Sequence, residues 1–235
     1  MKKLLFTIML TMTVAATSMA AQKMPLKDVD TDAFTTDTQV APKGTGDDHV
    51  ALVWWIPNEF WETILYRDTT TSESDKKVML NAMAGISLLA VVQSDISPLG
   101  AFTFYPKEEI ENRMEISYFD LDGKKHSLSP MQTINPDLQV ILGVFKPILS
   151  AAMGNLGNNM HFYVLNDKSE SSSRLLDPYK EGQLNVQLMR RDKAIMNASI
   201  EMPLNALFIP RKCPNGKDAH ISWKYCPWTG KKLEE

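Results

Sequence analysis

The clearest helical pattern of apolar residues lies between Asn135 and Met153. The apolar positions repeat at intervals of three and four residues, which places them on one stripe of an α-helix and predicts that this stripe faces the core. They are Leu138, Ile141, Leu142, Phe145, Ile148, Leu149 and Ala152. Asn135 is suited to an N-cap, and Pro136 suits the first helical turn, where its missing N–H costs no hydrogen bond. Pro147 predicts a kink, and Gly154 predicts the end of the helix.

Short runs rich in Val, Ile, Leu and aromatic residues predict strands elsewhere in the chain. The most apolar runs are 49–55 and 86–93, whereas 183–189 and 194–201 read as the two arms of a hairpin around a charged turn. Strands and helices mix without a regular βαβ rhythm. We therefore expect an α+β fold in which a largely antiparallel sheet packs with a central kinked helix.

The first twenty residues have the three parts of a secretory signal peptide. Lys2 and Lys3 form a basic start, residues 4–16 are apolar apart from threonines, and residues 18–20 read Ser-Met-Ala, a small-x-small cleavage site. The segment is too short for a membrane anchor, so we expect cleavage after residue 20 and a periplasmic or secreted protein. Residues 21–48 are rich in Thr and Asp and are broken by proline and glycine, which predicts a flexible leader before an α+β domain over 49–210.

Composition and charge narrow the range of partners. Hydrophobic residues make up 44 % of the 235-residue chain, which is enough for a packed core. Loss of Lys2 and Lys3 would leave 23 basic against 28 acidic residues, a net charge of −5. An acidic balance without a basic cluster argues against nucleic acid and anionic membranes as partners. No segment after residue 20 reaches the roughly 18 uncharged apolar residues of a membrane span, so we do not expect an integral membrane protein.

The tail, residues 211–235, contains the most distinctive motif. Cys213-Pro with Gly216 forms one half, and Cys226-Pro-Trp with Gly230-Lys-Lys-Leu, preceded by Tyr225, forms the other. This tail resembles a zinc ribbon of the short bacterial kind, which has two Cys-Pro-x-Cys-Gly knuckles. The chain as a whole also resembles uncharacterised exported bacterial proteins that end in such a ribbon. That resemblance implies a small C-terminal ribbon-like knob and no particular activity.

The tail departs from the ribbon pattern at the metal ligands. Thr229 stands where the outer cysteine of the second knuckle is expected, and the first knuckle is one residue short and has no second cysteine. Because a structural zinc site takes four ligands, a four-cysteine site is excluded. In a ribbon the first cysteines of both knuckles bind one metal, so the resemblance implies that Cys213 and Cys226 lie close together. In an exported protein we expect them to form a disulfide with no cofactor, the alternative being zinc held by Cys213, His220 and Cys226.

Few other residues have catalytic chemistry. His161 lies within an expected strand, and a structural role is the simpler interpretation because no nucleophile motif accompanies it. Glu59 and Glu62 lie one helical turn apart, which fits two exposed carboxylates better than the paired acids of a glycosidase. The Asp-Leu-Asp-Gly run at 120–123 resembles the start of a calcium loop without the later ligands, so it predicts a hairpin turn.

Aromatic residues are dense in the first expected strand and its following helix, and again in the tail. Adjacent strand residues face opposite sides of a sheet, so an open sheet face would expose one of two neighbouring tryptophans for stacking on a sugar ring or a partner. A helix over that face would bury it instead. The candidate binding residues are Trp54, Trp55, Trp61, Trp223, Tyr225 and Trp228.

The sequence favours a non-enzymatic binding or interaction module of the bacterial envelope. Its partner would be an unidentified envelope protein or polymer, because no catalytic motif is present and the tail resembles an interaction module. One alternative is a hydrolase that uses His161 and a carboxylate in a cleft. Another is a zinc-binding sensor that acts through the tail.

Overall fold

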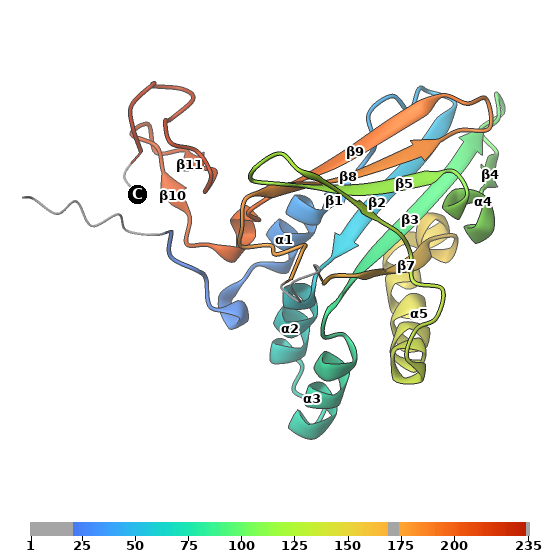
Figure 1. Ribbon diagram of the computed structural model, residues 1–235, viewed down its shortest axis with the longest axis horizontal. Coiled ribbons are helices and arrows are strands. Elements are labelled where there is room, and N and C mark those ends of the chain that lie inside the picture. The colour runs from blue at the N-terminus through green and yellow to red at the C-terminus, as the bar shows by residue number, and fades with distance from the viewer. Residues whose placement is uncertain (1–20, 169–173, 234–235) are drawn as a thin grey trace, which may run out of the picture.

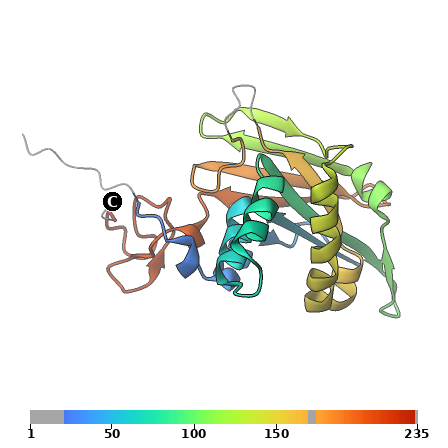
Figure 2. The same ribbon diagram turned by 90° about the horizontal axis from the view of Figure 1, so that it is seen from below.

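A computed structural model describes residues 21–168 and 174–233 (Figure 1). All strand pairings within its sheets are antiparallel, which confirms the expected α+β class with largely antiparallel sheets. The expected signal peptide, residues 1–20, lies outside the described residues. Helices lie together on one side of a five-stranded sheet, and a four-stranded sheet covers the other side (Figure 2).

The long strand β3 is the centre of the five-stranded sheet. The strands are β1 (Gln39–Val40), β2 (His49–Ile56), β3 (Ile86–Ile96), β4 (Phe102–Phe104) and β7 (His161–Asn166). One edge of β3 pairs with β2, which in turn pairs with β1. The other edge of β3 pairs with β7 over residues 86–91 and with β4 over residues 94–96. Residues 88–92 of β3 are all buried, as expected for a strand covered on both faces.

The four-stranded sheet consists of two hairpins. Its strands are β5 (Met114–Asp120), β6 (Lys125–Leu128), β8 (Gly182–Met189) and β9 (Ile195–Met202), in the order β6-β5-β8-β9. Both predicted hairpins are present, and the 120–123 run forms the turn between β5 and β6, with Gly123 at φ 75°. Exposed and buried residues alternate strictly along β9, so one face of this sheet packs on the core and the other faces solvent.

Most helices begin at the residues that their sequences indicate. They are α1 (Thr31–Thr38), α2 (Asn58–Arg67), α3 (Glu73–Ala82), α4 (Lys107–Glu111) and α5 (Pro136–Asn158), with 3-10 turns η1 (Leu26–Asp28) and η2 (Asn205–Leu207). The Ser72 hydroxyl accepts the N–H of Asp75 at 3.2 Å and caps α3. Asn135 caps α5 by accepting the N–H of Asp137 at 2.8 Å.

The predicted kink in α5 is present. The segments Pro136–Ile148 and Ser150–Asn158 differ in direction by 94°, close to Pro147. The backbone at Gly154 is non-helical (φ 59°, ψ −133°) and breaks the helix where its end was predicted, although helical turns continue to Asn158. Among the described residues no single helix is long and apolar enough to cross a membrane. The two bent halves of α5 reach that length and apolar composition only when they are taken together.

The apolar stripe predicted for α5 is fully buried only near the start of the helix. Leu138 and Ile141 are buried, whereas Ile148 is 58 % exposed. The organising element of the fold is therefore β3, and α5 is an outer helix packed beside α3. Helical periodicity identified the element but not how much of its apolar surface a neighbour would cover.

The expected flexible leader is an ordered part of the domain, so that prediction is wrong for much of 21–48. Asp30 caps α1 by accepting the N–H of Asp32 at 2.8 Å, and Val29 and Phe34 are fully buried. Lys23 forms a bridge with Phe208 near the end of the domain. Polar composition suggested disorder, but two well-spaced apolar residues and a helix cap are enough to anchor a short helix.

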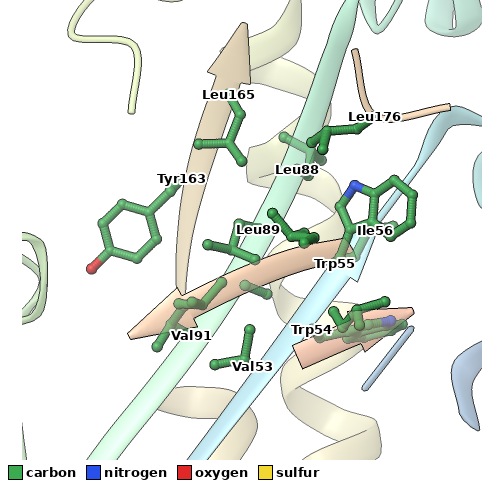
Figure 3. Close-up of a cluster of buried hydrophobic side chains, with 14 of the residues drawn as sticks. Val53, Trp54, Trp55, Ile56, Leu88, Leu89, Val91, Tyr163, Leu165 and Leu176 are labelled. Atoms are coloured by element: carbon green, nitrogen blue, oxygen red, sulfur yellow. The ribbon is translucent and has the colours of Figure 1, made fainter. Parts of the chain in front are cut away.

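Trp54, Trp55 and Trp61 lie in the core, so they provide no exposed aromatic surface. Figure 3 shows Trp54 and Trp55 among the buried side chains. Trp54 faces the helices, where its ring contacts Phe60 of α2 at 5.4 Å, and its indole N–H donates to Thr38 at 3.2 Å. Trp55 is fully buried on the opposite face of β2. The condition for exposing one tryptophan, an open sheet face, is not met because both faces of this sheet are covered.

Candidate functional site

The tail begins with a short hairpin that leads into the first cysteine turn. Strands β10 (Arg211–Lys212) and β11 (Asp218–Ala219) pair across it. The Cys213 N–H donates to the Lys217 carbonyl and the Gly216 N–H donates to the Cys213 carbonyl, both at 2.8 Å. Gly216 has φ 81°, a conformation that a side chain would strain.

The second cysteine turn has the same hydrogen-bond pattern with one more residue. The Cys226 N–H donates to the Lys231 carbonyl and the Gly230 N–H donates to the Cys226 carbonyl, again at 2.8 Å. Gly230 also has positive φ, at 66°. The sequence similarity between the two halves of the tail therefore corresponds to a shared backbone geometry.

Cys213 and Cys226 form the centre of a small core with Ala219 and Leu233. They are free thiols, near one another but beyond disulfide distance. Burial raises the pKa of Cys213, and its hydrogen bond with Cys226 raises it further, to about 11. Burial acts to raise the pKa of Cys226 as well, but hydrogen bonds from Cys213, from the Thr229 hydroxyl and from backbone N–H groups outweigh burial and lower it to about 7.

The tail does not match the ligand requirement of a structural zinc site. Within the described residues no three His, Cys, Asp or Glu side chains are grouped so that they could hold a metal ion. His220, the third ligand of the zinc alternative, is hydrogen-bonded through Nδ1 to the Ser222 hydroxyl at 2.8 Å. The two cysteines thus supply half of the four ligands that such a site needs.

The tail aromatics are on the surface, unlike the tryptophans of the domain. Trp223, Tyr225 and Trp228 are 36 %, 59 % and 49 % exposed. The Trp223 and Trp228 rings meet edge to face with centroids 5.8 Å apart, and the Lys217 ammonium lies 4.8 Å from the centroid of the Trp228 ring. Large aromatic side chains presented in this way are typical of binding surfaces.

The tail also packs on the domain. Ile221 is buried as part of the main core, and its N–H donates to the Asn205 side chain at 2.9 Å. Asn205 belongs to η2, which is in turn tied to α1 because the Ala206 N–H donates to Asp37 at 2.8 Å. The aromatic surface is therefore anchored to the domain rather than carried on a free linker.

His161 lies in a pocket of about 450 Å³ between β7, α4, α5 and the segment before α5. Its walls combine apolar residues such as Leu142 and Phe162 with the charged groups of Lys107, Lys146 and Glu111. The hydrolase alternative expected His161 and a carboxylate in a cleft. His161 does line a pocket, and the carboxylate of Glu111 lies in the same lining.

The contacts of His161 favour a structural role. Its Nε2 lies 3.2 Å from the Tyr105 carbonyl, which fixes that nitrogen as the donor. Burial lowers the pKa of His161, and the nearby Lys146 and Lys107 lower it further. Among the described residues no carboxylate or hydroxyl is hydrogen-bonded to the ring, so the pocket lacks the nucleophile and orienting acid that hydrolysis through His161 would need.

Glu59 is buried rather than exposed, which corrects the expectation for the Glu59 and Glu62 pair. It accepts two hydrogen bonds from Arg174, which also donates to the buried Asp167 at 3.0 Å. Burial raises the pKa of Asp167, although hydrogen bonds from the Leu176 N–H and from Arg174 oppose this. Burial also raises the pKa of Glu62, and the Glu59 charge adds to that effect.

A second network of polar side chains, which the sequence prediction missed, joins the two sheets. Asp95 of β3 accepts hydrogen bonds from His49 and Tyr105, each at 2.9 Å, and from Arg191 in the β8–β9 turn at 2.9 Å. Arg191 also binds Glu109 of α4 through two hydrogen bonds. The five residues are scattered over 143 positions, so no local motif signals the network.

Comparison with known proteins finds no matching protein family, curated protein or solved structure.

Proposed function

We propose that the chain is an exported bacterial envelope protein that acts as a non-enzymatic binding or interaction module. Its ribbon-like tail is metal-free and presents the binding surface, and its partner is an envelope protein or polymer. The signal-like N-terminus is the basis for the location, and periplasmic or secreted forms both agree with it. The observation that carries the binding role is the exposure of Trp223, Tyr225 and Trp228 together on an anchored module.

The chemistry of this surface supports recognition rather than catalysis. Trp and Tyr offer large, rigid contact area with little side-chain entropy to lose, and they dominate binding energy at interfaces. Their exposure is costly for a tail without a partner, because aromatic surface in contact with water is unfavourable. Among the described residues no three His, Cys, Asp or Glu side chains are grouped so that they could hold a catalytic metal.

A pull-down from envelope extract with the mature chain tests this proposal. Trp228→Ala and Tyr225→Ala should each weaken recovery of the specific partner about tenfold or more, as expected for hot-spot aromatics. Tyr66→Ala is the matched control, because Tyr66 is an aromatic residue of α2 that is 65 % exposed and lies outside the tail. Recovery that is equal for the wild type, both tail variants and the control would reject the tail as the binding surface.

The hydrolase alternative rests on the His161 pocket. It would be favoured if His161→Gln abolished a hydrolytic activity of the purified chain without lowering its stability. The zinc-sensor alternative predicts one zinc per reduced chain and its loss on His220→Ala. Neither alternative has support from grouped side chains among the described residues.

A further inference from the structure

The solvent face of the four-stranded sheet carries rows of paired polar side chains. The strand register places Ser117 of β5, Asn185 of β8 and Ser199 of β9 side by side in one row. In the next row Gln187 lies beside Asn197. Each of these residues alternates along its strand with a buried apolar neighbour, so all five project from the same outward face.

The chemistry of these rows is not what a solvent-facing sheet requires. Asn is depleted in strands, whereas Thr would be equally soluble and favours them. Two asparagines and a glutamine nevertheless occupy adjoining strands, at positions where packing imposes no choice. A face rich in amides and hydroxyls therefore suggests a function other than solvation.

The amides are held in place by one another. The Ser199 hydroxyl donates to Asn185 Oδ1 at 2.7 Å, and Asn185 Nδ2 donates to Gln183 Oε1 at 2.9 Å. Gln187 Nε2 donates to Asn197 Oδ1 at 3.2 Å. These bonds leave the side-chain NH2 group of Asn197 and the side-chain carbonyl of Gln187 without hydrogen-bond partners among the described residues. A free donor and a free acceptor therefore lie next to each other on neighbouring strands.

The same residues line a hollow of about 320 Å³ on this face. Phe119 of β5 lines the hollow with a partly buried ring, and Ser117, another lining residue, is 6 % exposed. The charged lining residues Glu115 and Lys125 neutralise each other in an ion pair of 2.7 Å. The hollow is therefore neutral overall, rich in hydrogen-bonding groups, and lined by one aromatic ring.

We propose that this face is a binding site for a neutral carbohydrate chain. A sugar presents neighbouring hydroxyls, each both donor and acceptor, which match the adjacent amide N–H and carbonyl groups of Asn197 and Gln187. The apolar face of a sugar ring can pack on Phe119. The volume lies at the low end of the range for ligand pockets, roughly 300 Å³, and suits one or two sugar units of a chain that continues along the sheet.

Rigid strands favour such a site because little order has to be gained on binding. The amides sit on paired strands of the sheet and are restrained by hydrogen bonds before any ligand arrives. An anionic polymer would gain no net attraction from the paired Glu115 and Lys125. The site shares no residue with the aromatic tail, so each can fail its test without affecting the other.

The test is to titrate the ¹⁵N-labelled mature chain with the hexasaccharides of β-1,4-linked N-acetylglucosamine and of α-1,4-linked glucose. With dissociation constants on the order of 1 mM, about 10 mM sugar should shift the side-chain amide resonances of Asn185, Gln187 and Asn197. The Asn197→Ala and Gln187→Ala variants should each weaken binding about tenfold. The tail resonances should not move.

Ser127→Ala is the matched control, because Ser127 faces the same side from β6, beside Ser117, but does not line the hollow. It should bind as the wild type does. Unchanged amide resonances with both sugars would overturn the proposal, as would shifts that persist in both hollow variants. Thermal unfolding of each variant shows whether the fold is retained.

Discussion

Arg174 holds Glu59 in a two-pronged ion pair, with Nη1 2.5 Å from Oε1 and Nη2 3.0 Å from Oε2. The two residues lie 115 positions apart, and the same guanidinium also binds Asp167. Glu59 and Asp167 are 7 % and 1 % exposed, so Arg174 compensates two buried carboxylates at once. This pair fixes α2 against the segment that follows β7.

Arg174→Met should lower the free energy of unfolding by about 3 kcal/mol, because it leaves two buried carboxylates without their cation. Urea unfolding measures the change. Lys180→Ala is the control: Lys180 pairs with Asp177 at 3.0 Å but is 67 % exposed, and the change should stay within about 0.5 kcal/mol. Similar values for the two variants would show that the Arg174 cluster is not a buried network.

Much of the fold was accessible from the sequence because its signals are local. The cap at Asn135, the kink near Pro147 and both hairpins depend on a few neighbouring residues, and all were predicted correctly. The burial of Trp55, on the face of β2 opposite the helices, could not be decided in the same way. It depends on the second sheet, which is formed by residues more than fifty positions further along the chain.

The candidate site shows the same limit. The similarity of the two tail halves was visible because Cys-Pro and Gly recur within a few residues. The Asp95 network and the rows of amides on β8 and β9 were not visible, because they arise from strand register and from long-range pairing. The polar composition of residues 21–48 led to a wrong prediction of a flexible segment, because the buried ring of Phe34 anchors the helix that contains it.

Phe34→Ala should destabilise the chain by about 3–5 kcal/mol, the usual cost of removing a fully buried aromatic ring. The ring contacts Phe60 of α2 edge to face at 5.5 Å, so the loss reaches the core of the domain. Thr36→Ala, on the exposed side of α1, should cost well under about 1 kcal/mol. If both variants unfold at the wild-type urea midpoint, residues 31–38 contribute nothing to the core.

Stability should fall as the pH drops from about 7.5 to 5.5. Burial lowers the pKa of both His49 and His161 below the unfolded value of about 6.5. In that window the unfolded chain therefore binds more protons than the folded chain, and the stabilisation that is complete above pH 6.5 is lost on acidification. Each histidine contributes at most about 1.4 kcal/mol per pH unit.

Urea unfolding at the two pH values measures this slope, and His161→Gln and His49→Gln should each reduce it. The complete burial of the His49 side chain favours the neutral ring and lowers its pKa, whereas the hydrogen bond with Asp95 opposes this by raising the pKa. A wild-type protein that becomes more stable on acidification would contradict the assignment of these histidines as neutral in the folded state.

The redox state of the tail is the most informative single property. We predict that Cys213 and Cys226 form a disulfide in protein taken from the periplasm, because they share one small core and the compartment is oxidising. The bond would close a loop of about 14 residues and stabilise the tail by about 3 kcal/mol in the chain-entropy model. Intact mass with and without reductant and alkylation, together with zinc content, measures this directly.

A mature chain whose mass is lower by two hydrogen atoms than that of the reduced chain, and which contains no zinc, would establish the disulfide. The tail would then remain a binding module. Reduced protein should then react with iodoacetamide first at Cys226, since its pKa is about 7 and that of Cys213 is about 11. Cys213→Ala removes the thiol that donates to Cys226, so it should raise the pKa of Cys226 and slow its alkylation at neutral pH. Free thiols with one zinc per chain would instead mean that Cys213 and Cys226 are metal ligands, and the aromatic surface would then belong to a zinc-dependent tail.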